Sequence, residues 1–160
     1  MSDPELLAYH EAGHVVVACE VGGRVLSASI DPDSDGGDVE READVVIEWP
    51  NGRSPKADVW VALAGPAAET IYEGHAQIDG ELLTAWSGDW RAASDAVARM
   101  YETRGQRLRH LRASIADLDR LLRRDDVWAV VGDVADALLA HEHLDEDLLA
   151  DVLGPWGMDA

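Results

Sequence analysis

Residues 8–14 read AYHEAGH, and this stretch decides how the rest of the 160-residue chain is interpreted. His10 and His14 are four residues apart, so they lie on the same face of a helix with 3.6 residues per turn. The surrounding residues 4–20 are predicted to form that helix, because apolar side chains recur at helical spacing and Pro4 suits a first turn. Two imidazoles on one helix face can bind a single metal ion.

The pattern His-Glu-x-x-His is typical of catalytic zinc sites, in which three protein ligands leave one position open for water. Zinc lowers the pKa of such a water to about 7 and polarises a peptide carbonyl. Glu11 follows His10 directly and can take the proton of that water as a general base. The motif therefore predicts Zn²⁺ as cofactor, His10 and His14 as ligands and Glu11 as the base. The alternative is a pair of surface histidines beside a glutamate.

The third ligand has to come from the helical half of the chain. Candidates by side-chain chemistry are Glu69, Glu73, His75, Asp89 and Asp95. Asp89 has one local argument, because it lies at a predicted helix start, where a carboxylate is well held. The residues alone leave both interpretations of Asp89 open, a metal ligand or an N-cap. Glu69 is also a candidate partner that orients a histidine, and Trp86 and Trp90 flank Asp89 as candidate walls of a cleft.

Periodicity predicts a mainly α-helical α+β domain that spans residues 1–160. A small sheet of two or three strands is expected near residues 24–49, where residues 24–30 and 43–49 have the pattern of strands. Helices are predicted for residues 56–73, 89–103, 106–123, 126–141 and 146–153, the last of them forming a C-terminal helical bundle. Gly13 inside the first helix costs about 1 kcal/mol relative to alanine, which indicates a close neighbour at that turn.

Composition excludes several classes of function. The formal net charge is −19, which argues against a general nucleic-acid binder or an anchor on anionic lipid. The longest apolar run, residues 59–64, is far shorter than the roughly 20 residues of a membrane span. Cys19 is the single cysteine and is expected to be a small buried hydrophobe, so the simplest location is the reducing cytoplasm. The single lysine, Lys56, follows proline, so the chain lacks a phosphate-binding P-loop.

Residues 8–14 resemble the zinc-site helix of the FtsH-type metalloproteases, the ATP-dependent membrane-bound proteases of bacteria and organelles. The resemblance continues in order along the chain. Residues 62–69 (ALAGPAAE) look like that family's second helix, and residues 87–100 (SGDWRAASDAVARM) resemble the segment that carries its aspartate ligand. Residues 137–153 (ALLAHEHLDEDLLADVL) resemble its C-terminal pair of helices.

This resemblance implies a zincin-like helix with His10 and His14 as ligands, Asp89 as the third ligand and Glu11 as the general base. It also implies that the strand near residues 24–30 is an edge beside the metal, to which an extended substrate could add. The chain departs from the family pattern where Pro66 replaces the usual arginine. The absence of a P-loop indicates a peptidase domain without the ATPase module, which cannot by itself use ATP to unfold a protein.

The sequence thus predicts a zinc-dependent metallopeptidase that acts on peptides or unfolded protein segments. Two alternatives stay open: a catalytically silent binding or adaptor module, and a zinc hydrolase acting on another bond. Retention of Glu11 argues against the silent module, because a structural zinc site needs no base. A separate ATPase partner or a homo-oligomer is compatible with the sequence, which names neither.

Overall fold

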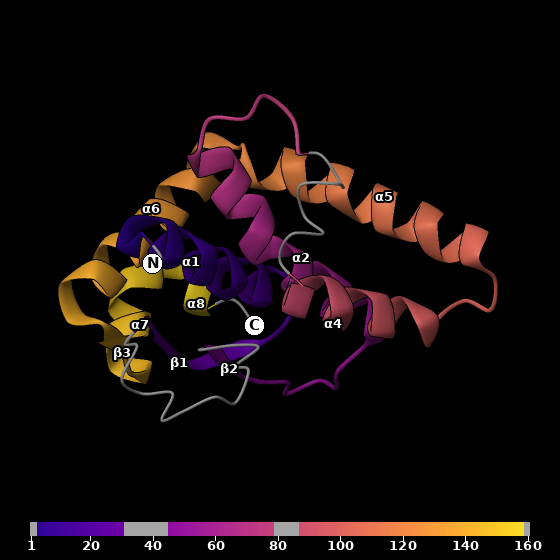
Figure 1. The fold of residues 1–160 in the computed structure, drawn as a ribbon. Helices are drawn as coiled ribbons and strands as arrows, with labels where there is room; N and C mark the ends of the chain where they lie inside the picture. The colour runs from indigo at the N-terminus through magenta and orange to yellow at the C-terminus, as the bar shows by residue number, and fades with distance from the viewer. Residues whose placement is uncertain (1–2, 31–44, 79–86, 159–160) are drawn as a thin grey trace.

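The computed structural model describes residues 3–30, 45–78 and 87–158. The chain is a mainly helical α+β protein with a small antiparallel sheet (Figure 1), as the sequence predicts. The helices are α1 (Pro4–Glu20), α2 (Pro55–Tyr72), α4 (Ser87–Ala98), α5 (Arg104–Leu122), α6 (Asp125–His141), α7 (Glu146–Leu153) and α8 (Pro155–Met158). The strands are β1 (Arg24–Ser29), β2 (Val45–Glu48) and β3 (His143–Leu144).

Side-chain caps fix several helix starts. The carboxylate of Asp3 accepts a hydrogen bond from the backbone of Glu5 at the start of α1, 2.9 Å away. The helix predicted for residues 89–103 begins at Ser87 and ends earlier, at Ala98. Thr103 cannot belong to this helix, because it caps α5 and forms a capping box with Gln106. A capping residue takes an extended backbone, so it cannot also belong to the preceding helix.

The sheet has the strand order β2-β1-β3, so β1 lies in its centre. The expectation that all strands lie near residues 24–49 is wrong, because β3 comes from the C-terminal part of the chain and pairs with the end of β1. The expectation that β1 is an edge strand is also wrong. β2 runs antiparallel to β1 from the pair Arg24 and Glu48 onward, and among the described strands it is an edge of the sheet. Only the tertiary fold brings β3 to the far side of β1.

Helix α1 lies at the centre of the fold, with α2, α6 and β1 packed around it (Figure 1). Its residues from Glu11 to Cys19 are all buried, which explains why the helix is apolar on nearly every side. Cys19 is 8% exposed, and burial raises the pKa of its thiol to about 11. A helix held on several sides gives its two histidines fixed positions.

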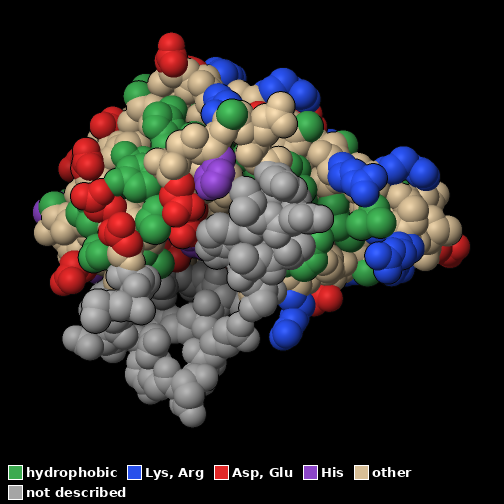
Figure 2. All heavy atoms as spheres, turned by 45° about the horizontal axis from the view of Figure 1, so that its top comes forward, with side chains coloured by type: hydrophobic (Ala, Val, Ile, Leu, Met, Phe, Trp, Pro, Cys, Tyr) green, Lys and Arg blue, Asp and Glu red, His purple; other side chains and the backbone are tan. Residues whose placement is uncertain are grey.

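Charged side chains are distributed unevenly over the surface. Figure 2 shows the Lys and Arg side chains gathered toward the end of the molecule where α5 projects, and Asp and Glu gathered toward the opposite side. Exposed arginines in the N-terminal half of α5 include Arg104, Arg109 and Arg112. Among the described residues, no helix combines the length and the apolar character needed to cross a membrane.

Gly13 marks the closest approach of α1 to α2. A Cβ atom at this position would lie 2.6 Å from the backbone oxygen of Ala64 and 2.7 Å from the Cβ of Ala68. The expectation of a close neighbour at this turn is therefore confirmed. Because the obstructing atoms belong to a backbone and to a short side chain, one of the two helices would have to move to admit a methyl group.

Replacing Gly13 with alanine should destabilise the domain by about 1–3 kcal/mol, the usual cost of overpacking a filled core. The gain of about 1 kcal/mol in helix propensity opposes this cost without cancelling it. Urea unfolding of both proteins measures the difference. Gly132→Ala is the matched control, because its new Cβ atom would meet nothing closer than 3.6 Å. Equal stabilities of the Gly13→Ala and Gly132→Ala variants would contradict the close packing of α1 on α2.

Candidate metal centre

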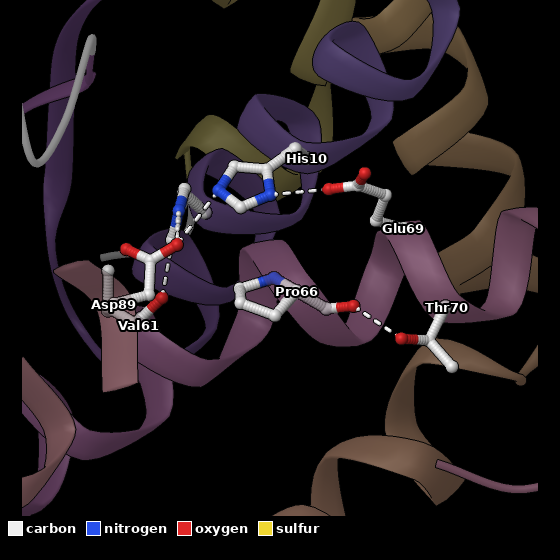
Figure 3. A network of polar contacts seen from close by, with 7 residues as sticks. His10, Val61, Pro66, Glu69, Thr70 and Asp89 are labelled. Carbon is white, nitrogen blue, oxygen red and sulfur yellow. Dashed lines mark hydrogen bonds and ion pairs between the residues drawn. The ribbon is translucent and has the colours of Figure 1, made fainter. Parts of the chain in front are cut away.

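Three metal-binding side chains from two helices converge on one point (Figure 3). His10 and His14 extend from α1, and Asp89 extends from the first turn of α4. The Oδ2 atom of Asp89 lies 2.8 Å from Nε2 of His10 and 3.5 Å from Nε2 of His14. One ligand atom from each of the three residues lies within 4.8 Å of the other two. The structure thus brings together the two histidines of the motif and one of the five candidates for a third ligand.

Helix α2 holds both imidazole rings from behind. Nδ1 of His10 donates a hydrogen bond to Oε2 of Glu69 at 2.9 Å, and Nδ1 of His14 donates to the backbone oxygen of Val61 at 2.6 Å. A carboxylate and a carbonyl can only accept, so a ring that gives up one proton to bind a metal ion keeps the other on Nδ1 and offers the lone pair of Nε2 to the ion. Such outer partners orient the histidine ligands of metal sites.

The charge on Asp89 dominates the protonation of this cluster. Burial lowers the pKa of His10, but the hydrogen bonds to Asp89 and Glu69 outweigh it and raise the pKa to about 10. Burial also opposes a charge on His14, yet the charge of Asp89 raises the pKa of that ring. Burial alone would raise the pKa of Asp89. The charge on His14 and the hydrogen bond to His10 outweigh burial and hold this pKa well below its usual range. Asp89 is therefore a carboxylate at neutral pH, the form that binds metal ions.

Gly65 on α2 leaves the space into which both imidazoles point. A Cβ atom on Gly65 would lie 2.3 Å from Nε2 of His14 and 2.8 Å from Nε2 of His10. The shorter of these distances is near the roughly 2.0–2.1 Å between zinc and a histidine nitrogen, and the other is longer. The missing side chain thus keeps open a space that is bordered by both Nε2 atoms.

The residues present fit a zinc ion. Two ligand atoms about 2.0–2.1 Å from a tetrahedral zinc are about 3.4 Å apart, and the two nitrogen–oxygen distances here are 2.8 and 3.5 Å. Nε2 of His14 is buried and makes no hydrogen bond within the described part of the chain. Oδ2 of Asp89 is 3.5 Å from this buried atom, so a metal ion between them would give it a closer partner. Two imidazoles and a carboxylate form a donor set that zinc commonly takes.

Glu11 belongs to the same buried surface of α1. Its side chain is 5% exposed, and its charge raises the pKa of both His10 and His14. The carboxylate of Glu11 is thus within electrostatic reach of both rings. This position is where a general base for a water molecule at the metal would have to lie.

A cleft of about 350 Å³ opens beside this cluster. Its walls come from α2, α4, the edge strand β2 and the residues that follow these elements, and its lining includes His14, Asp89, Ile47, Trp49, Arg53, Asp58, Ala62 and Arg99. Because β2 is the edge of the sheet, the edge strand beside the candidate metal site is β2 and not β1. An extended peptide could approach the cleft along that edge.

The remaining predicted site residues lie in different places. Glu69 contacts His10, whereas the candidates Glu73, His75 and Asp95 are exposed. Trp86 lies outside the described residues. Trp90 packs against the hydrophobic core, and among the described residues Trp49 is the tryptophan that lines the cleft.

Several contributors to the site were not found from the sequence. The backbone oxygen of Val61 carries no sequence signal, because every residue has one. Gly65 did carry a signal: it is a glycine next to Pro66 inside a helix, and both residues are unfavourable there. The chain tolerates this pair, and Thr70 returns a hydrogen bond to the oxygen of Pro66 at 2.8 Å (Figure 3). A costly glycine on the helix facing the histidines indicates a close approach.

Comparison of the chain with models of known protein families and with curated proteins finds no match. The chemistry of the site therefore follows from its own side chains. These are two imidazoles held by α2, one carboxylate from α4 and one buried glutamate, beside a cleft whose lining includes residues of β2.

Proposed function

We propose that this chain is a zinc-dependent metallopeptidase that hydrolyses peptide bonds in peptides or unfolded protein segments. The observation that carries the proposal is the convergence of His10, His14 and Asp89 at the wall of the cleft. The zincin-like arrangement, the C-terminal helical bundle and the relationship to FtsH-type peptidases are parts of the same proposal. A structural zinc site would favour four protein ligands, whereas the three found here leave a position for water.

In this proposal the side chains have separate tasks. His10, His14 and Asp89 hold the ion, while Glu69 and the carbonyl of Val61 keep the rings in the tautomer that binds it. Bound zinc supplies a Lewis acid, which makes water a nucleophile near neutral pH and polarises a carbonyl. Glu11 takes the proton of the attacking water and delivers it to the leaving amine.

Asp89→Ala tests the proposed site directly. Elemental analysis of protein purified without chelator or histidine tag should give near one zinc per wild-type chain. The variant should lose at least about 100-fold in zinc affinity, because even outer partners of a metal site are worth 10–100-fold. Hydrolysis of an unstructured peptide mixture should fall with the bound zinc. Asp133→Ala, which removes an exposed aspartate from α6, is the matched control.

The outcomes separate the competing functions. A folded wild-type chain that binds no metal, even when zinc is offered, would overturn the proposal and favour a binding module. Stoichiometric zinc with no hydrolysis of any peptide would leave a metal-containing binding module or a hydrolase of another bond. Zinc-dependent peptide hydrolysis that Asp133→Ala retains and Asp89→Ala loses supports the peptidase.

A further inference from the structure

Two arginines that line the cleft, Arg53 and Arg99, both bind the carboxylate of Asp58. Nε of Arg53 donates to Oδ1 of Asp58 at 2.6 Å, and Nη2 of Arg99 donates to Oδ2 of the same carboxylate at 2.9 Å. Asp58 is only 8% exposed, whereas the side chains of Arg53 and Arg99 are 65% and 58% exposed. All three residues line the cleft that contains His14 and Asp89. A buried carboxylate thus fixes two guanidinium groups that remain open to the cleft.

Most hydrogen-bond donors of these two side chains have no acceptor among the residues that the structure describes. A guanidinium carries five N–H groups, and Asp58 accepts one from each arginine. Asp95 also lines the cleft, but it is exposed and forms no ion pair with either arginine within the described part of the chain. Neighbouring guanidinium groups with free, planar donors are suited to bind a carboxylate in bidentate geometry.

We propose that Arg53 and Arg99 form a subsite that binds a carboxylate of the substrate, with Asp58 as the positioning residue. This inference rests on the proposed peptidase function and names its substrate class: peptides with a carboxylate at a set distance from the bond that is cleaved. The carboxylate belongs either to an Asp or Glu side chain or to the C-terminus of the peptide.

The helix geometry gives that distance. Asp58, which anchors the arginine pair, lies seven residues before Gly65, which faces both imidazoles, so these two positions are about 10 Å apart along the axis of α2 at 1.5 Å per residue. An extended peptide advances about 3.3 Å per residue. The preferred carboxylate should therefore lie about three residues from the cleaved bond.

A degenerate decapeptide mixture tests the inference with the zinc-loaded full chain. In one arm both peptide ends are blocked, and mass spectrometry of the products reads which residues surround the cleaved bonds. In the other arm the C-terminal carboxylate is free. Enrichment of Asp and Glu in the first arm assigns the subsite to side chains, whereas cleavage about three residues from the C-terminus, seen only in the second, assigns it to the terminal carboxylate. We expect a preference of about tenfold in either case.

The preference should vanish in Arg53→Gln/Arg99→Gln. That variant leaves Asp58 buried without its partners, which can destabilise the fold, so Arg53→Gln/Arg99→Gln/Asp58→Asn is tested beside it. Arg109→Gln/Arg112→Gln removes the same charge from exposed positions of α5 and is expected to keep the preference. Cleavage without any carboxylate preference, or a preference that both cleft variants retain, overturns the inference and leaves the peptidase proposal standing.

A binding measurement decides the case in which no peptide is cleaved. Fluorescence anisotropy compares fluorescein-labelled decapeptides that carry Glu or Gln at one position, using the Glu11→Gln protein. Tighter binding of the Glu peptide that is lost in the cleft variants supports the carboxylate subsite even if the peptidase proposal fails. Equal binding of the two peptides overturns the subsite.

Discussion

Gly65→Ala is expected to abolish zinc binding while the helical fold is retained. The new methyl group would lie 2.3 Å from Nε2 of His14 and 2.8 Å from Nε2 of His10. Both rings would have to turn away from the point where they now converge. The side chain of His14 is only 4% exposed, so the ring has little room to find another position that still faces Asp89. The atoms that must shift are the ends of side chains, so the backbone can stay in place.

Elemental analysis and circular dichroism together measure this prediction. The wild type and the Gly132→Ala control should bind near one zinc per chain, and Gly65→Ala should bind close to none with the same helical signal. Alanine favours a helix over glycine by about 1 kcal/mol, so lost folding is not the expected cause. Stoichiometric zinc in the Gly65→Ala variant would show that the ion lies elsewhere than between the two Nε2 atoms.

Glu11→Gln is expected to remove peptide hydrolysis and to leave zinc bound. Glutamine has nearly the same shape as glutamate but cannot take a proton from water, and general acid–base catalysis contributes about 10²–10⁴-fold to a rate. We therefore expect hydrolysis of the peptide mixture to fall at least about 100-fold. The zinc content should remain near one per chain, because the ligands in this proposal are His10, His14 and Asp89.

Glu20→Gln provides the matched control for this variant. Glu20 is the last residue of the same helix and is exposed, so the same chemical change there should alter neither the rate nor the metal content. Hydrolysis that survives in Glu11→Gln would rule out Glu11 as the base. Loss of zinc in Glu11→Gln would instead point to a role of this carboxylate in holding the metal.

Local sequence patterns were sufficient to predict most of the helices in the fold. The helical spacing of apolar residues and the capping residues predicted most helices within a few residues, because these signals act over one or two turns. The prediction for residues 89–103 extends too far, because its last residue, Thr103, is the N-cap of α5. Strand β3 was missed because two residues carry too little periodicity to be recognised.

In the candidate site, too, residues close in sequence were predicted and contacts between distant residues were not. The sequence by itself determined that His10 and His14 share one helix face and that Glu11 lies beside them, because this follows from 3.6 residues per turn. The residues alone left Asp89 open between ligand and cap, and the structure places it in the first turn of α4, facing both rings.

Only the tertiary structure decided what surrounds those histidines. Glu69 and the carbonyl of Val61 are 59 and 47 residues from the rings they hold, and Arg53 and Arg99 meet at Asp58 across 46 positions of the chain (99 − 53). Such contacts depend on how α1, α2 and α4 pack against one another. No periodic pattern encodes that packing, because each helix buries its apolar face whichever partner covers it. The motif therefore fixes the helix face that carries both histidines, and helix packing decides which carboxylate, which supporting groups and which cleft lie beside them.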